Sequence, residues 1–67
     1  MKEFGERLKK LRTNRHMTQE ELGSIFNPPL SQSTVGTYEN GKRQPTLENL
    51  VVISKYFNVT TDYLLCL

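Results

Sequence analysis

The sequence of 67 residues contains one cysteine, one histidine and no tryptophan. A lone thiol, Cys66, cannot form an internal disulfide or supply the ligand set of a metal site. We interpret it as an apolar side chain that fills space, because the sequence around it offers no group that would activate a nucleophile. His16 lies between two predicted helices, and we interpret it as a turn residue rather than a catalytic base.

Long apolar stretches are also missing. The longest ones cover residues 50–53 and 63–67, whereas a helix that crosses a bilayer needs about 18 apolar residues. The first residues, MKEFGERLKK, place charges where a secretory signal peptide has its apolar centre. No glycine-rich phosphate loop and no carboxylate pair near a histidine is present. We therefore expect a cytoplasmic protein that is no enzyme, uses no metal or cofactor, binds no membrane and forms one domain over residues 1–67.

Positive charge is concentrated near the start of the chain. Residues 1–17 contain six of the nine lysines and arginines against two glutamates, and the pair Lys42 and Arg43 follows a stretch, residues 18–40, whose only charges are glutamates. This distribution is compatible with a polyanionic partner. It is also what a solvated helix face produces, which is the commoner case, so charge alone does not decide between them.

Apolar residues recur at helical spacing throughout the chain. In the first segment Phe4, Leu8 and Leu11 are separated by four and three residues, which predicts one amphipathic helix. No segment shows the alternation of a half-buried strand. The sequence predicts an all-α fold with five helices, at residues 3–14, 19–26, 32–40, 47–57 and 61–66.

Capping residues mark where these helices begin and end. Thr18 and Glu21 have the spacing of a capping box, and Met17 is placed to pack on Leu22 as a hydrophobic staple. The last three helices are preceded by N-cap residues of the same kind, Ser31, Thr46 and Thr60. Asn40-Gly41 and Asn58 supply the residues that end the third and fourth helices. Several short helices joined by abrupt turns are therefore expected.

The predicted helix 32–40 has an unusual outer face. Val35 and Tyr38 are its inward apolar positions, while the opposite face carries neither a charge nor a large apolar side chain: Gln32, Ser33, Gly36 and Thr37. Glycine and threonine inside a helix cost about 1 and about 0.5 kcal/mol relative to alanine. Such local violations cluster at functional surfaces. In the preceding helix, Gly23 is expected to let another helix approach closely.

Three motifs carry a resemblance to a known family. The chain contains T-Q-E-E-L at 18–22, S-x-S-T-V at 31–35 and Y-E-N-G-K-R-Q-P-T-L-E-N-L at 38–50. In combination they resemble the helix-turn-helix domain of the Cro/cI-type regulators, the XRE family of lambda-repressor-like domains. The resemblance extends from about Phe4 to Leu65. It implies a compact five-helix lambda-repressor-like fold in which the helix-turn-helix unit spans about residues 18–40 and the helix 32–40 enters the DNA major groove.

The resemblance also implies site residues. Gln32, Ser33 and Thr37 match base-contacting positions, and Gly36 between them would let the helix backbone approach the bases. The chemistry agrees, since glutamine pairs with adenine, serine bonds several bases and the threonine methyl meets that of thymine. Contacts to the DNA backbone are implied for Thr18, Gln19, Asn40, Lys42 and Arg43, together with the amides after the helix.

Two further expectations concern the scaffold around these residues. Arg12 and Glu39 match a structural ion pair of the family, and the Gln19 amide is expected to brace Gln32. One segment departs from the family pattern: Phe26-Asn27-Pro28-Pro29-Leu30 makes the turn between the two helices two residues longer. Two prolines stiffen it, and we expect the second helix to stop near Phe26 and the docking of the third to shift.

The function implied is sequence-specific DNA binding by a nucleoid-associated transcriptional regulator, a repressor that binds a palindromic operator as a homodimer. The segment 63–67 carries more apolar side chains than one short helix buries, so Tyr63, Leu65 and Leu67 are candidate dimer contacts, although Leu64 is as well explained by the core. The alternative is a protein-interaction module of the same fold, such as an antitoxin-like domain or one that binds a protein antagonist. Steep salt dependence would favour DNA over an apolar protein contact.

Overall fold

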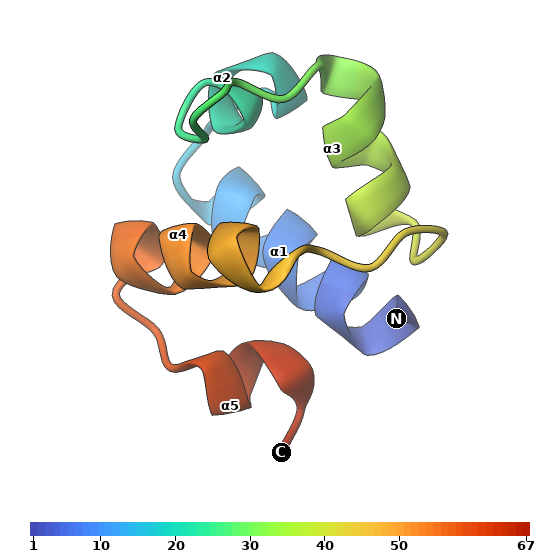
Figure 1. The fold of residues 1–67 in the computed structure, drawn as a ribbon, viewed down its shortest axis with the longest axis vertical. Coiled ribbons are helices and arrows are strands. Elements are labelled where there is room, and N and C mark those ends of the chain that lie inside the picture. Colours follow the sequence, from blue (N-terminus) through green and yellow to red (C-terminus); the bar gives the residue numbers. More distant parts are fainter.

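A computed structural model describes all 67 residues and contains five helices and no strand (Figure 1). The helices are α1 (Lys2–Asn14), α2 (Gln19–Gly23), α3 (Gln32–Glu39), α4 (Leu47–Phe57) and α5 (Thr61–Leu65). The all-α class and the five helices are thus confirmed. Four of the helices begin and end within one residue of the predicted bounds, and α2 is the exception.

The helix α2 ends at Gly23, three residues before the predicted end. Beyond it the chain tightens into turns in which the Ile25 and Phe26 amides donate to the carbonyls of Leu22 and Gly23. Phe26 nevertheless stays in the core with 2% of its surface exposed. The Leu30 amide also donates to the Gly23 carbonyl, at 3.0 Å, so the proline-containing loop folds back onto the end of α2.

The core is built from ten buried apolar residues that come from all five helices and the end of the α2 turn. In Figure 1, α2 and α3 lie on one side of α1 and α4, and α5 lies on the other. Residues of α1 contact both α3 and α5, while α2 packs on α3. The core members are Phe4, Leu8, Leu22, Phe26, Val35, Tyr38, Leu50, Ile53, Phe57 and Leu64.

The predicted N-caps are confirmed. The Thr18 hydroxyl accepts from the Glu21 amide while the Glu21 carboxylate accepts from the Thr18 amide, which completes the capping box. Ser31, Thr46 and Thr60 each accept from the amide three residues ahead. At the other ends Gly41 and Asn58 adopt positive φ, as does His16 in the turn after α1. Local sequence therefore fixes the places where these helices begin and turn.

Glycine at position 5 sets the distance between α1 and α3. A Cβ atom on Gly5 would lie 2.5 Å from the carbonyl oxygens of both Tyr38 and Glu39. The first helix therefore packs directly on the backbone at the end of α3. The expectation for Gly23 is confirmed only in part. A Cβ atom there would clash with the Leu30 carbonyl oxygen of the loop, while the nearest atom of another helix, Val35 Cγ2 of α3, would lie at an ordinary contact distance of 3.5 Å.

The interpretation of Cys66 as an apolar side chain that fills space is wrong. Cys66 is exposed and in the left-handed conformation at the end of α5, because Leu64 occupies the interior position of that short helix. No helix of the structure combines the length and the apolarity that a bilayer crossing requires.

Candidate nucleic-acid interface

The outer face of α3 carries the residues predicted to contact bases. Gln32 and Ser33 are exposed, and Gly36 and Thr37 are half-buried. The Thr37 hydroxyl donates to the Thr34 carbonyl at 2.7 Å, which leaves the methyl group as the part of this side chain without a partner. The face thus offers an amide, a hydroxyl, bare backbone and a methyl, and no charge. We call these four residues the α3 ridge.

The opposite face of α3 anchors the ridge to the core. Val35 is fully buried and Tyr38 is 2% exposed. The Tyr38 ring meets Phe4 of α1 edge-on with 6.3 Å between ring centroids, and its hydroxyl accepts from Asn49 of α4 at 3.2 Å. Because the helix is held by α1, α4 and its own cap at Ser31, the ridge is presented from a rigid support.

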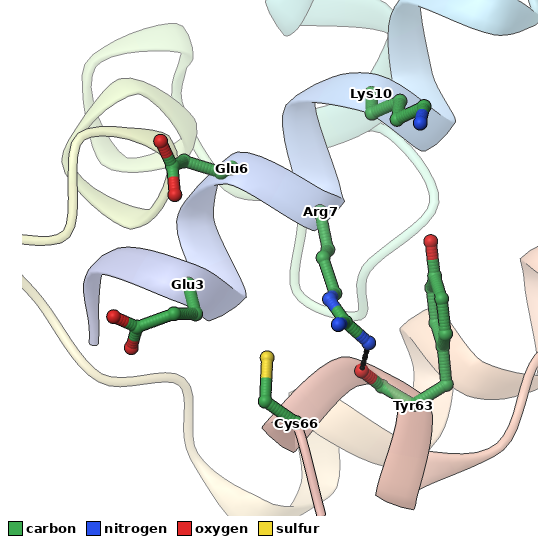
Figure 2. Close-up of a pocket in the computed structure, with 6 residues that line it drawn as sticks. All are labelled: Glu3, Glu6, Arg7, Lys10, Tyr63 and Cys66. Atoms are coloured by element: carbon green, nitrogen blue, oxygen red, sulfur yellow. Dashed lines mark hydrogen bonds between the residues drawn. The ribbon is translucent and has the colours of Figure 1, made fainter.

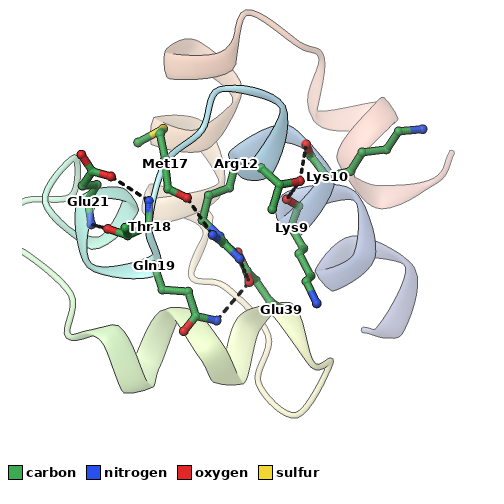
Figure 3. A network of polar contacts seen from close by, with 9 residues as sticks. Lys9, Lys10, Arg12, Met17, Thr18, Gln19, Glu21 and Glu39 are labelled. Atoms are coloured by element: carbon green, nitrogen blue, oxygen red, sulfur yellow. Dashed lines mark hydrogen bonds and ion pairs between the residues drawn. The ribbon is translucent and has the colours of Figure 1, made fainter.

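The predicted ion pair between Arg12 and Glu39 is present (Figure 3). The guanidinium donates through Nε to Oε2 at 2.6 Å and through Nη2 to Oε1 at 3.0 Å. Its third nitrogen, Nη1, donates to the Met17 carbonyl at 2.7 Å. The hydrogen bonds to Glu39 raise the pKa of Arg12, and burial, the next largest influence, opposes this rise. The pair ties α1 to the last residue of α3.

Gln19 does not brace Gln32. Its Nε2 instead donates to Glu39 Oε1 at 3.1 Å, as Figure 3 shows. The Glu39 carboxylate therefore accepts from Arg12 of α1 and from the first residue of α2 at the same time. The expectation failed because Glu39 offers a buried, charged acceptor, which forms stronger hydrogen bonds than a neutral amide.

The loop after α3 presents side chains rather than backbone amides. The Lys42 and Arg43 amides both donate to the Thr37 carbonyl, at 3.0 and 3.2 Å, and the Gly41 amide donates to Tyr38. These amides are used to end the helix, so the expectation that they grip phosphate does not fit this conformation. The side chains of Lys42 and Arg43 are exposed.

All nine residues predicted to contact DNA line three open depressions around α3. The first, of about 300 Å³, is lined by Ser33, Thr34, Thr37, Lys42 and Arg43. The second, of about 290 Å³, is lined by Lys9, Gln19, Gly36, Glu39 and Asn40. The third, of about 260 Å³, is lined by Thr18, Glu20 and Gln32. The structure thus brings the predicted residues to one region of the surface.

Three of these lining residues were missed by the sequence analysis: Lys9, Glu20 and Thr34. Lys9 belongs to α1, outside the helix-turn-helix unit, and its sequence neighbourhood is a run of charges like that of any solvated helix. Only the packing of α1 on α3 places it beside Gly36 and Asn40.

A fourth depression, of about 470 Å³, lies between α1 and α5 (Figure 2). The Arg7 guanidinium lies over the Tyr63 ring at 4.5 Å from its centroid and donates to the Tyr63 carbonyl. Of the candidate dimer residues, Tyr63 and Leu67 are exposed and Leu65 is half-buried. The other lining residues are Glu3, Glu6, Lys10 and Cys66, so acidic and basic side chains balance at this place.

Comparison with known proteins agrees with this geometry. A family model described as helix-turn-helix matches residues 8–64. The chain belongs to the XRE-type helix-turn-helix family. The fold class and the resemblance expected from the sequence are thus confirmed, and the matched family and the named relatives are transcriptional regulators, not enzymes.

Three relatives illustrate the likeness. The transcriptional activator BcrR of Enterococcus faecalis is 43% identical over 63 residues, which are 94% of this chain and 30% of BcrR. The P22 c2 repressor, solved in complex with a synthetic operator, has a TM-score of 0.84 at 28% identity, with 96% of this chain and 94% of that chain covered. The restriction-modification controller protein C.AhdI of Aeromonas hydrophila has a TM-score of 0.77 at 32% identity, with 92% and 91% covered.

The chain is short beside its curated relatives. It spans 30% of BcrR and 56% of the prophage-derived regulator YonR of Bacillus subtilis. It therefore corresponds to the helix-turn-helix part of those longer regulators.

Proposed function

We propose that this chain binds double-stranded DNA sequence-specifically, with the α3 ridge in the major groove, and regulates transcription. The observation that carries the proposal is the uncharged ridge on a rigid helix directly beside the exposed cations Lys42 and Arg43. Base edges in the major groove are read by amides, hydroxyls and methyl groups, whereas phosphates are bound by cations. The P22 c2 repressor, a structural neighbour solved with an operator, supports the same role.

The proposal includes a homodimer on a palindromic operator. One such module covers only about 600–1,000 Å², while a two-fold dimer presents two recognition helices about 34 Å apart. The exposed side chains of Tyr63 and Leu67, with half-buried Leu65, are the proposed dimer contacts. We further propose that the protein acts as a repressor. This role is supported by the likeness to the P22 c2 repressor. The alternative is activation of transcription, because the relative BcrR is named an activator.

Selection of bound sites from a pool of random duplexes tests specificity and symmetry together. We expect enrichment of one inverted repeat with half-sites about one helical turn apart. Thr37→Ala should relax the selected sequence at one base position and weaken binding to the selected site by about 1–3 kcal/mol. Absence of any enriched sequence from wild-type protein would contradict sequence-specific readout.

Thr13→Ala is the matched control for Thr37→Ala. Each hydroxyl donates back to a carbonyl of its own helix, Thr13 to Lys9 at 2.9 Å and Thr37 to Thr34 at 2.7 Å. The two substitutions therefore remove the same kind of helix contact, but Thr13 lines none of the depressions around α3. We expect Thr13→Ala to leave the selected sequence unchanged.

Salt separates DNA binding from the protein-interaction alternative. The logarithm of the DNA affinity should fall with the logarithm of salt concentration by about 0.9 for each neutralised phosphate. Binding of a protein antagonist or a toxin-like partner through apolar side chains would change little with salt. A chain that binds no duplex even in dilute buffer would therefore point to the interaction module.

A further inference from the structure

The lysines and arginines of residues 1–17 have different environments in the structure. Arg7 and Arg15 each lie over aromatic rings, and Arg12 forms the one ion pair of the chain. The lysines of α1 form no ion pair. Each of these arginines thus has a partner within the chain. The lysines of α1 are the cations that remain free to bind a partner molecule.

Two neighbouring lysines of α1 lie on different sides of the molecule. Lys9 lines the depression beside Gly36 and Asn40 of the α3 region, whereas Lys10 lines the depression between α1 and α5. Figure 3 shows the Lys9 side chain extending toward the α3 side and Lys10 extending away from it. Adjacent residues on a helix point about 100° apart, so this divergence follows from the helix itself.

The two depressions also differ in charge. Of the residues that line the depression with Lys9, only Glu39 is acidic. Its side chain is 4% exposed, and its carboxylate already accepts from Arg12 and Gln19. In this depression, therefore, no unpaired acidic group balances the positive charge of the Lys9 ammonium. Beside Lys10, two glutamates and two cations line the same depression and balance each other.

Hydrogen-bond donors accompany Lys9. Asn40 Oδ1 accepts from the Lys42 amide at 3.1 Å, which assigns the oxygen to this bond and leaves the Asn40 NH₂ group as a donor. Gln19 Nε2 uses one hydrogen on Glu39 and retains the other. An ammonium with two amide donors suits a phosphate oxygen, which accepts several hydrogen bonds and carries negative charge.

We propose that Lys9 binds a backbone phosphate of the duplex whose bases the α3 ridge reads. The proposal rests on the proposed DNA-binding function and adds to it a contact from α1, outside the helix-turn-helix unit. The phosphate would lie in the depression lined by Lys9, Gln19, Gly36 and Asn40. Because a phosphate contact carries no sequence information, Lys9 contributes affinity and register but no base preference.

The test measures the salt dependence of binding to a fluorescein-labelled duplex of mixed sequence, for wild-type protein and three variants. Lys9→Gln should lower the slope of log affinity against log salt by about 0.9 and weaken binding about five- to tenfold at 0.1 M salt. Lys10→Gln, the matched control one residue along the same helix, should leave the slope unchanged. Lys9→Arg should retain the wild-type slope, because it keeps the charge.

The outcomes distinguish this proposal from the function on which it rests. Equal slopes for Lys9→Gln, Lys10→Gln and wild type would overturn the Lys9 contact while leaving DNA binding intact. An equal decrease in both variants would also overturn it, since net charge and not position would then matter. Wild-type protein that binds no duplex would overturn both. Neither lysine side chain has a hydrogen bond or ion pair within the chain, so folding should survive both substitutions, and thermal unfolding checks this.

Discussion

Gln19 and Glu39 are joined by a hydrogen bond of 3.1 Å although they lie twenty residues apart. The bond connects the start of α2 with the end of α3, and Arg12 of α1 shares the same carboxylate. Three helices therefore meet at one buried acceptor. The relative placement of α2 and α3, on which any docking to DNA depends, is set partly by a residue of α1.

Removal of one partner of the ion pair should cost far more than removal of both. Arg12→Met leaves the Glu39 carboxylate, 4% exposed, without its main donor, and we expect a loss of about 3–5 kcal/mol in the free energy of unfolding. The double variant Arg12→Met, Glu39→Leu should recover most of this loss, because no buried charge remains. Urea unfolding measures both. Equal destabilisation by the single and double variants would contradict the coupling.

The contribution of the pair should not depend on pH in the ordinary range. Hydrogen bonding to Glu39 raises the pKa of Arg12 above its value in the unfolded chain. Stabilisation of this sign is complete below the unfolded pKa and is lost only as pH rises through the folded pKa, which for arginine lies far above the physiological range. The difference in unfolding free energy between wild type and the double variant Arg12→Met, Glu39→Leu, which lacks both charged groups, should thus stay constant from about pH 6 to 9. A difference that shrinks as pH rises within that range would contradict this assignment.

Two glycines should respond in opposite ways to alanine. At Gly5 a Cβ would lie 2.5 Å from two carbonyl oxygens of the α3 backbone, so Gly5→Ala should cost about 1–3 kcal/mol of stability. At Gly36 the nearest atom is the Gln19 amide at 3.7 Å, an ordinary contact, so Gly36→Ala should stabilise the chain by about 1 kcal/mol.

Gly36→Ala should weaken DNA binding even though it stabilises the fold. If the α3 backbone approaches the bases there, the added methyl group should weaken binding to a selected site about tenfold, which is about 1.4 kcal/mol. Thermal unfolding and fluorescence anisotropy measure the two effects on the same sample. A Gly36→Ala protein that binds as tightly as wild type would show that this glycine does not face the bases closely.

Local signals in the sequence were enough to predict most of the fold. Thr18, Ser31, Thr46 and Thr60 cap their helices through contacts three residues away, so a short window of sequence contains all the information needed. The end of α2 could not be predicted this way. Beyond Gly23 the chain turns, and the Gly23 carbonyl accepts from the Leu30 amide at 3.0 Å, a contact with a residue seven positions away across the proline-containing loop.

The candidate site was predictable in residue type but not in its internal contacts. Gln32 and Ser33 lie exposed on α3, as the helical spacing required. The choice of Glu39 over Gln32 as the partner of Gln19 depends on which buried acceptor the folded chain brings near, and the position of Lys9 depends on how α1 packs. Neither is encoded in spacing along one helix. Both follow from contacts between helices.

An acidic residue at the edge of the proposed interface should oppose DNA binding. Glu20 is exposed and lines the depression shared with Thr18 and Gln32. Its carboxylate would repel a phosphate at about 8 Å by about 0.5 kcal/mol in water. Glu20→Gln should therefore tighten binding to a mixed-sequence duplex about two- to threefold, and fluorescence anisotropy at low salt measures this.

Glu48→Gln is the control for that substitution. Both residues are exposed acids in the first turn of a helix, so each variant loses the same favourable interaction with the helix dipole. Glu48 lines none of the depressions around α3. Tighter binding by Glu48→Gln to the same extent would show that net charge alone is responsible.

The proposed dimer can be tested with two leucines of similar exposure. Leu67 is 86% exposed beyond α5 and Leu47 is 75% exposed at the start of α4. A charge introduced into an apolar interface must be desolvated, so Leu67→Glu should shift the protein toward monomer, whereas Leu47→Glu should not. Sedimentation at high micromolar concentration measures the shift. Since neither side chain belongs to the core, both variants should fold. A wild-type protein that stays monomeric with and without duplex DNA would refute the dimer. Dissociation by Leu47→Glu but not by Leu67→Glu would show that the dimer interface lies at α4 instead.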